Sequence, residues 1–184
     1  METKRLAEYL DRYLEVGAIA DYKNALNGLQ VENSGRVGRI GVAVDASAAS
    51  IAAAAQLGCG LLLVHHGLFW DGQVPLTGRR YQRVKALIES DVALYSAHLP
   101  LDVHPEVGNN VVLARALGIA MEGTFGVTDG PPAGVHGRLA ITREALTARL
   151  NDVLGNQVKL LSGGPETIER VGVITGGAGS MIGG

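Results

Sequence analysis

The segment Leu61-Leu62-Leu63-Val64-His65-His66-Gly67 places four aliphatic residues directly before two histidines and a glycine. A short, continuous aliphatic run is typical of a strand that is buried on both faces of a parallel sheet. On either side of it, further aliphatic runs alternate with segments of helical spacing. The strands are expected at 39–45, 61–64 and 92–96, and the helices at 47–57, 79–90 and 109–117. This alternation predicts an α/β fold with mostly parallel sheets and helices on their faces.

The Gly- and Pro-rich residues 123–134 mark the clearest domain boundary in the chain. We therefore expect a first α/β lobe at 1–122 that carries the histidine pair. A small α/β insert lobe is expected at 123–167, with a strand at 158–161. Residues 168–184 are expected to begin a C-terminal segment that returns to the first lobe and stops early.

A short internal repeat relates the first lobe to this C-terminal segment. Residues 37–42 and 168–173 each place an Arg before an aliphatic-glycine-aliphatic strand pattern. If the repeat reflects a duplication, the second copy stops just as its helix begins, where Ile182 takes the place of Ile51. The match is short, so chance similarity is the alternative explanation.

The composition excludes several classes of function. The 184 residues are 47% hydrophobic with a formal net charge of −2, and the scattered basic residues give no nucleic-acid footprint. The apolar runs are too short for a membrane span, and the charged N-terminus lacks the apolar core of a signal peptide. The single cysteine, Cys59, lies in an apolar run and is expected to be a small buried residue. A cytoplasmic protein is therefore expected.

The histidine pair that follows the 61–64 strand is the first candidate for metal binding. Imidazole is the commonest metal ligand at neutral pH, and sites in α/β sheets form beyond the carboxyl ends of strands. Adjacent residues on a regular strand point to opposite faces, but a backbone turn at the strand end can bring His65 and His66 together. Taken alone, the pair is better explained as two polar residues that close a strand.

His98 and Asp102 change that balance because they follow the 92–96 strand. The carboxyl ends of parallel neighbours meet at one sheet edge, so imidazoles and a carboxylate would gather there, a set that suits Zn, Mn, Fe or Ni. Pro100 argues against a helix between His98 and Asp102. The alternative role for Asp102 is an Asx-turn or a helix cap. The spacing therefore favours a metal site with Asp102 as a ligand beside the histidine pair.

Several motifs, in order along the chain, resemble the NIF-three-like family, whose members are also known as GTP cyclohydrolase 1 type 2 homologues. The motifs are Asn27-Gly28-Leu29-Gln30-Val31, Val44-Asp45, His65-His66-Gly67-Leu68-Phe69-Trp70, His98-Leu99-Pro100-Leu101-Asp102, Gly108-Asn109-Asn110 and the strand 170–175 leading into Gly176-Gly177. Together they extend over nearly the whole chain. The resemblance implies a two-lobed α/β protein that assembles as a toroidal homohexamer and holds two divalent metal ions in a cleft.

Carried over by position, the resemblance makes His65 and His66 each a ligand of one metal ion and Asp102 a further ligand. His98 would either bind an ion itself or orient a ligand or a water molecule. Members of the family continue to a His and a Glu that complete the site, and neither has a counterpart up to Gly184. The C-terminal part is therefore expected to be missing, with half a dinuclear site present.

The leading hypothesis for function is a metal-dependent hydrolase of the cyclohydrolase or phosphoesterase type that acts on a small-molecule substrate. The alternative is a non-catalytic metal-binding or scaffolding oligomer with an incomplete site. No catalytic or substrate-binding residue is assigned by the sequence. Phe69 and Trp70, next to the histidine pair, suit a loop anchor or an interface better than a platform for a nucleobase.

Overall fold

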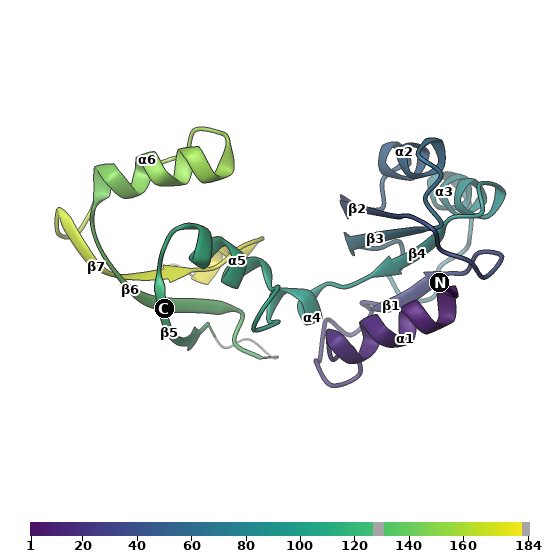
Figure 1. Cartoon of the computed structure of the whole chain (residues 1–184), viewed down its shortest axis with the longest axis horizontal. Helices are drawn as coiled ribbons and strands as arrows, with labels where there is room; N and C mark the ends of the chain where they lie inside the picture. The colour runs from purple at the N-terminus through teal and green to yellow at the C-terminus, as the bar shows by residue number, and fades with distance from the viewer. Residues whose placement is uncertain (127–130, 182–184) are drawn as a thin grey trace. The chain divides into compact units, whose positions relative to one another are not determined.

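The computed structural model describes residues 1–126 and 131–181, which fold as two compact units, Met1–Leu101 and Asp102–Gly184. The first unit is a small sheet with its helices (Figure 1). In chain order its elements are α1 (Thr3–Tyr13), β1 (Gly28–Val31), β2 (Ile40–Asp45), α2 (Ala48–Gln56), β3 (Leu61–His66), α3 (Gly78–Glu89) and β4 (Ala93–Ser96). The short helix α4 (Leu99–Asp102) follows β4 and ends at the first residue of the second unit.

The four strands of the first unit form one sheet in the order β1-β4-β3-β2. β3 runs parallel to both β2 and β4, while β1 pairs antiparallel with β4 at one edge. Helix α1 covers one face of the sheet, and α2 and α3 cover the other (Figure 1). The predicted α/β class with a mostly parallel sheet is confirmed for this unit. Because β2, β3 and β4 are parallel, their carboxyl ends lie at the same edge of the sheet.

Two apolar cores hold the helices against this sheet. The core on the side of α2 and α3 includes Ile51, Leu62, Leu87 and Leu94. The core on the side of α1 includes Leu6, Leu61 and Tyr95. Successive residues of one strand therefore enter different cores, which explains why the aliphatic runs are continuous instead of alternating with polar residues.

The start of α2 is fixed by a reciprocal cap between Ser47 and Ser50. Ser47 Oγ accepts a hydrogen bond from the Ser50 backbone N–H at 3.1 Å, and Ser50 Oγ accepts one from the Ser47 N–H at 2.9 Å. This reciprocal pair satisfies two of the backbone donors that a helix start leaves without partners. It also holds the turn between the end of β2 and α2 in a single conformation.

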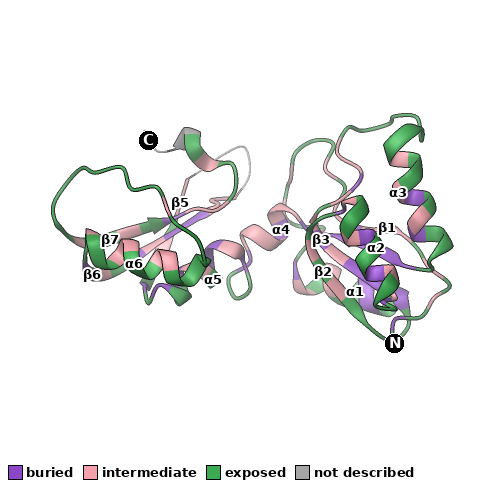
Figure 2. Cartoon of the chain, turned by 90° about the horizontal axis from the view of Figure 1, so that it is seen from above, coloured by how far each residue is buried: buried purple, intermediate pink, exposed green. Residues whose placement is uncertain are grey.

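The second unit is a three-stranded antiparallel sheet in the order β5-β6-β7 with two helices. Its elements are α5 (Asn109–Ala116), β5 (Ala120–Phe125), β6 (Gly134–Thr142), α6 (Arg143–Leu154), β7 (Thr167–Val173) and the 3-10 turn η1 (Ala178–Met181). Helix α6 has no buried residue, as its exposed and intermediate colours in Figure 2 show.

The border between the two units differs from the predicted lobes 1–122 and 123–167. The predicted first lobe includes α5, yet Val111 and Ala114 of this helix pack with Val135 and Val173 of the second sheet. A helix with one apolar face can cover either sheet, so its periodicity does not reveal which one it joins. Part of the predicted 123–134 junction is strand β5 instead, and residues 127–130 lie outside the described residues.

Two further expectations differ from the structure. Residues 158–161 lie in no strand, and Leu161 is 74% exposed. The two members of the short internal repeat pair differently, since β2 is parallel to β3 whereas β7 is antiparallel to β6. The proposed counterpart of Ile51, Ile182, lies outside the described residues. The topology of the two strands therefore does not support a duplication.

Among residues 1–126 and 131–181, no helix is long and apolar enough to cross a membrane.

Candidate metal centre

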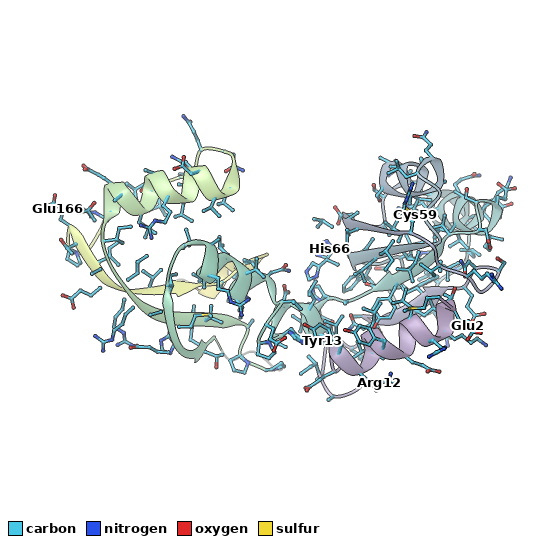
Figure 3. The ribbon with its side chains drawn as sticks, viewed as in Figure 1. Glu2, Arg12, Tyr13, Cys59, His66 and Glu166 are labelled. Atoms are coloured by element: carbon cyan, nitrogen blue, oxygen red, sulfur yellow. The ribbon has the colours of Figure 1, made fainter. Side chains whose placement is uncertain are left out.

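Three histidines meet at the sheet edge where the parallel strands end. His65 and His66 are the last residues of β3, and His98 follows the end of β4. Each residue offers one possible ligand atom, and these three atoms lie within 4.8 Å of one another. The ring centroids are 4.6 Å apart for His65 and His66, and 4.8 Å apart for His65 and His98. Figure 3 labels His66 at the end of its strand.

The two adjacent histidines converge because their rings bond to different neighbouring strands. His65 Nδ1 lies 3.0 Å from the carbonyl oxygen of Ala97, which follows β4. His66 Nδ1 lies 2.7 Å from Oδ1 of Asp45, the last residue of β2. Each ring is thereby held by a group at the end of the strand next to its own. The two imidazoles thus lie side by side at the strand end, and their role as metal ligands stays a prediction.

His98 is held by a closed set of hydrogen bonds from the loop before β1. Its Nδ1 lies 3.0 and 3.1 Å from the two carboxylate oxygens of Asp21. The His98 backbone N–H donates to Asn27 Oδ1 at 2.7 Å, and Asn27 Nδ2 donates to Asp21 Oδ2 at 2.8 Å. Asp21 and Asn27 therefore fix both the backbone and the ring of His98.

The ionisation of Asp21 suits this role. Burial by itself would raise the pKa of Asp21, but hydrogen bonds from His98, Asn27 and two backbone amides lower it to about 2. The Asp21 side chain is only 5% exposed, so water does not compete strongly for its oxygens. At neutral pH the group is a carboxylate that can only accept hydrogen bonds.

The bonding partners decide the tautomer of all three imidazoles. Ala97 offers a carbonyl oxygen, and Asp45 and Asp21 offer carboxylates, and these groups only accept hydrogen bonds. Each Nδ1 must therefore carry the proton, which leaves the lone pair of a neutral imidazole on Nε2. This arrangement is the one that metal-bound histidines commonly show, with the other ring nitrogen bonded to a carbonyl or a carboxylate. The donor set therefore fits a divalent metal ion.

Two of the histidines line a pocket of about 530 Å³. Its walls are Tyr22, Asp45, Ala46, Ser47, His66, Gly67, Trp70, Arg83 and His98. The Trp70 ring meets the His98 ring edge-on at 4.7 Å, and its Nε1 donates to the Gly67 carbonyl at 2.8 Å. Trp70 is thus both tied to its loop, as the sequence suggests, and part of the pocket wall.

Asp102 is not one of the three grouped residues. It ends α4 and is the first residue of the second unit, where its Oδ1 accepts a hydrogen bond from Asn109 Nδ2 at 2.7 Å. Its role as a metal ligand stays a prediction. The local conformation needs a correction, because the segment forms one helical turn although Pro100 argues against it. Pro100 stands in the first turn, where its missing N–H would have no partner within the helix anyway.

The comparison with known sequences identifies the family. The sequence profile of the Duf34/NIF3 (NGG1p interacting factor 3) family matches residues 1–183. The chain belongs to this family. It is 42% identical over 179 residues to the GTP cyclohydrolase 1 type 2 homolog of Deinococcus radiodurans, and the match covers 96% of this chain and 67% of that protein. For the Escherichia coli (strain K12) protein of the same name, identity is 39%, with 99% of this chain and 72% of that protein covered.

Solved structures confirm the fold. The Duf34/NIF3 chain matches protein ybgI, described as of unknown function, with a TM-score of 0.89 and 37% identity, over 100% of this chain and 73% of that one. It matches TTHA1606 from Thermus thermophilus with a TM-score of 0.88 and 36% identity, over 100% of this chain and 74% of that one. Both the predicted resemblance and the predicted fold class are therefore confirmed.

The structure gives physical reasons for two motifs of the Duf34/NIF3 chain. Gln30 Oε1 accepts a hydrogen bond from the Leu68 N–H at 2.8 Å, which ties the loop after the histidine pair to β1. A Cβ at Gly67 would overlap the side-chain amide of Gln30. The motif around Asn27 and Gln30 thus supports both strand ends that carry the histidines.

Asp45 and Asp21 were not assigned to the site by spacing, and only one of them leaves a signal in the sequence. Asp45 closes a strand just as the histidines do, and it pairs with His66 across β2 and β3. Asp21 lies in a loop with no periodic pattern, 77 residues before its partner His98. Only the path of the folded Duf34/NIF3 chain reveals that contact.

We expect Asp21→Asn to weaken binding of a divalent ion by about 10–100-fold, the usual effect of losing such a supporting partner. The amide that replaces one oxygen would present N–H groups to a site where His98, Asn27 and a backbone amide already donate. Titration with Co²⁺ measures the affinity. Asp152→Asn, at an exposed position of α6, is the matched control. Equal affinities for the two variants would contradict the assigned role of Asp21.

Proposed function

We propose that this chain binds a divalent metal ion through His65, His66 and His98, and that the complete protein is a metal-dependent hydrolase. The observation that supports the metal ion is the hydrogen-bonding pattern that the three rings share, since each Nδ1 faces a carbonyl or carboxylate oxygen. Three protein ligands and a water molecule are a usual set for a catalytic zinc ion. Asp102 is a further ligand that the resemblance implies.

A divalent ion in such a site lowers the pKa of a bound water and polarises a carbonyl or phosphoryl oxygen. The protein's own residues have separate tasks. Asp45 and Asp21 hold two of the imidazoles in the metal-binding tautomer. Trp70 and Tyr22 line the pocket and place their rings against His98.

The class of reaction comes from the relatives, which carry the name GTP cyclohydrolase 1 type 2 homolog. We propose hydrolysis of a small molecule, of the cyclohydrolase or phosphoesterase type. For the complete site the resemblance implies two ions and a homohexamer. The three histidines brought together in this chain suffice for one ion with water as its fourth ligand.

The experiment is a titration of the metal-free chain with Co²⁺. Trp70 is the single tryptophan and lies edge-on to His98, so a paramagnetic ion in the site should quench its fluorescence. We expect saturation at one ion per chain, the visible absorption of four-coordinate Co²⁺, and recovery of fluorescence when Zn²⁺ displaces it. Quenching that never saturates would contradict the proposed metal site.

Activity is measured separately on the loaded and the metal-stripped chain. Release of phosphate from a phosphomonoester and ring opening of GTP cover the two proposed reaction types. Turnover that depends on the ion supports the hydrolase. Tight binding of the ion without turnover of either compound supports a non-catalytic metal-binding protein instead.

A further inference from the structure

Arg83 reaches the histidine pocket from α3. Its neighbour in sequence, Val84, is buried in the core together with Leu87, which orients the helix on the sheet. Arg83 itself lines the pocket beside His66 and His98. The Arg83 Nη1 donates a hydrogen bond of 3.2 Å to the carbonyl oxygen of Ala46, next to the end of β2. This bond holds the guanidinium close to the edge of the sheet where the histidines gather.

The positive charge of Arg83 has no carboxylate partner within salt-bridge distance in the described part of the chain. Its helix neighbours differ, because Arg80 pairs with Asp71 at 2.6 Å and Lys85 pairs with Glu89 at 3.6 Å. The one carboxylate that lines the same pocket, Asp45, is bonded to His66. A guanidinium has five N–H donors, and the Ala46 carbonyl oxygen is its one protein acceptor in the described residues.

A divalent ion on the histidines would add to this charge, so the pocket would be strongly positive. Two further features of the pocket favour a bound anion. The N-terminus of α2, at Ser47, opens on the pocket and carries the positive end of the helix dipole. The planar guanidinium presents paired donors that match the two oxygens of a carboxylate or a phosphate.

We infer that Arg83 binds an oxyanion group, phosphate or carboxylate, of the small ligand that occupies the metal centre. The inference rests on the proposed function, because it places the reacting part of that ligand at the histidines. It goes further by naming the charge of the substrate and the residue that selects it. A neutral analogue of the same shape would leave the guanidinium without an anionic partner.

A second arginine on the same helix provides a matched control. Arg79 lies one helical turn before Arg83 and lines a neighbouring groove of about 600 Å³ between α2 and α3. It does not line the histidine pocket. The groove shares Arg83 and Ser47 with the histidine pocket, so Arg79→Ala removes the same charge from the same helix at a position next to the proposed site but outside its lining.

The test is calorimetric titration of the Co²⁺-loaded chain with inorganic phosphate and, separately, with acetate. Affinity for Co²⁺ is measured first, from Trp70 fluorescence. We expect Arg83→Ala to weaken binding of the preferred anion by about 10–100-fold, as for loss of hydrogen bonds to a charged group. Arg83→Gln, which keeps a donor for Ala46, should show the same loss, and Arg83→Lys a smaller one. Co²⁺ affinity should be the same in all of these variants and in Arg79→Ala.

The outcomes separate the inference from the proposed function. If Arg83→Gln, shown to be folded by its melting temperature, binds phosphate and acetate as the unmodified chain does, the inference is overturned. It is also overturned if Arg79→Ala weakens anion binding equally, or if the loaded chain binds neither anion. If the unmodified chain takes up no Co²⁺, the proposed function fails and the inference fails with it.

Discussion

Replacing Tyr95 by Ala is expected to lower the free energy of unfolding of the first unit by about 3–5 kcal/mol, as for other buried aromatic residues. Tyr95 stands in the central strand β4 and is 0% exposed. Its ring fills the core between the sheet and α1. Its hydroxyl donates a hydrogen bond of 2.7 Å to Asp11 Oδ1 on that helix. Ala would leave a cavity and an Asp11 without this donor.

Tyr95→Phe separates the two contributions. It keeps the ring and removes only the hydrogen bond, so we expect a loss of about 1 kcal/mol. Burial, together with the bond and the charge of Asp11, raises the pKa of Tyr95, so the phenol stays protonated and this difference should not vary around neutral pH. Denaturant unfolding followed by Trp70 fluorescence reports on the first unit, to which that residue belongs. Losses of equal size in the two variants would show that the ring does not pack as described.

The first sheet could be predicted because its signals are local. β3 begins with a continuous aliphatic run, β2 is mostly aliphatic, and every position of β4 is buried. Strand β5 has no such signal, because half or more of its residues are exposed and Gly123 interrupts its pattern. At 158–161 the sequence predicts a strand that the structure does not contain, because this apolar run has no neighbouring strand to pair with. Pairing is a property of the folded chain, and a run of apolar residues does not determine it.

The site was predictable to the extent that it follows from topology. Neighbouring parallel strands bring their carboxyl ends to one sheet edge, and this rule alone places His98 beside the histidine pair. The rule says nothing about residues in loops. Asp21 reaches His98 from a loop before β1, and Arg83 comes from the middle of a helix. Both were missed because their contacts depend on how distant segments pack.

We expect His65→Ala and His66→Ala each to weaken binding of Co²⁺ by more than about 100-fold. Removing only a supporting partner of a metal ligand already weakens binding by about 10–100-fold. A residue that supplies its own lone pair must contribute more than the group that orients it. The chain has five histidines, and His136 in β6 of the second unit is the matched control.

Metal content after dialysis and the quenching of Trp70 measure the effect independently. Because β3 ends at these residues, each variant is first compared with the unmodified chain by its melting temperature without metal. The unmodified chain and His136→Ala should melt at a higher temperature when Co²⁺ is added, since an ion that binds only the folded state stabilises it. His65→Ala and His66→Ala should show no such increase. If either variant keeps its cobalt and its increase in melting temperature, the ion binds elsewhere in the protein and the three histidines do not form the metal centre.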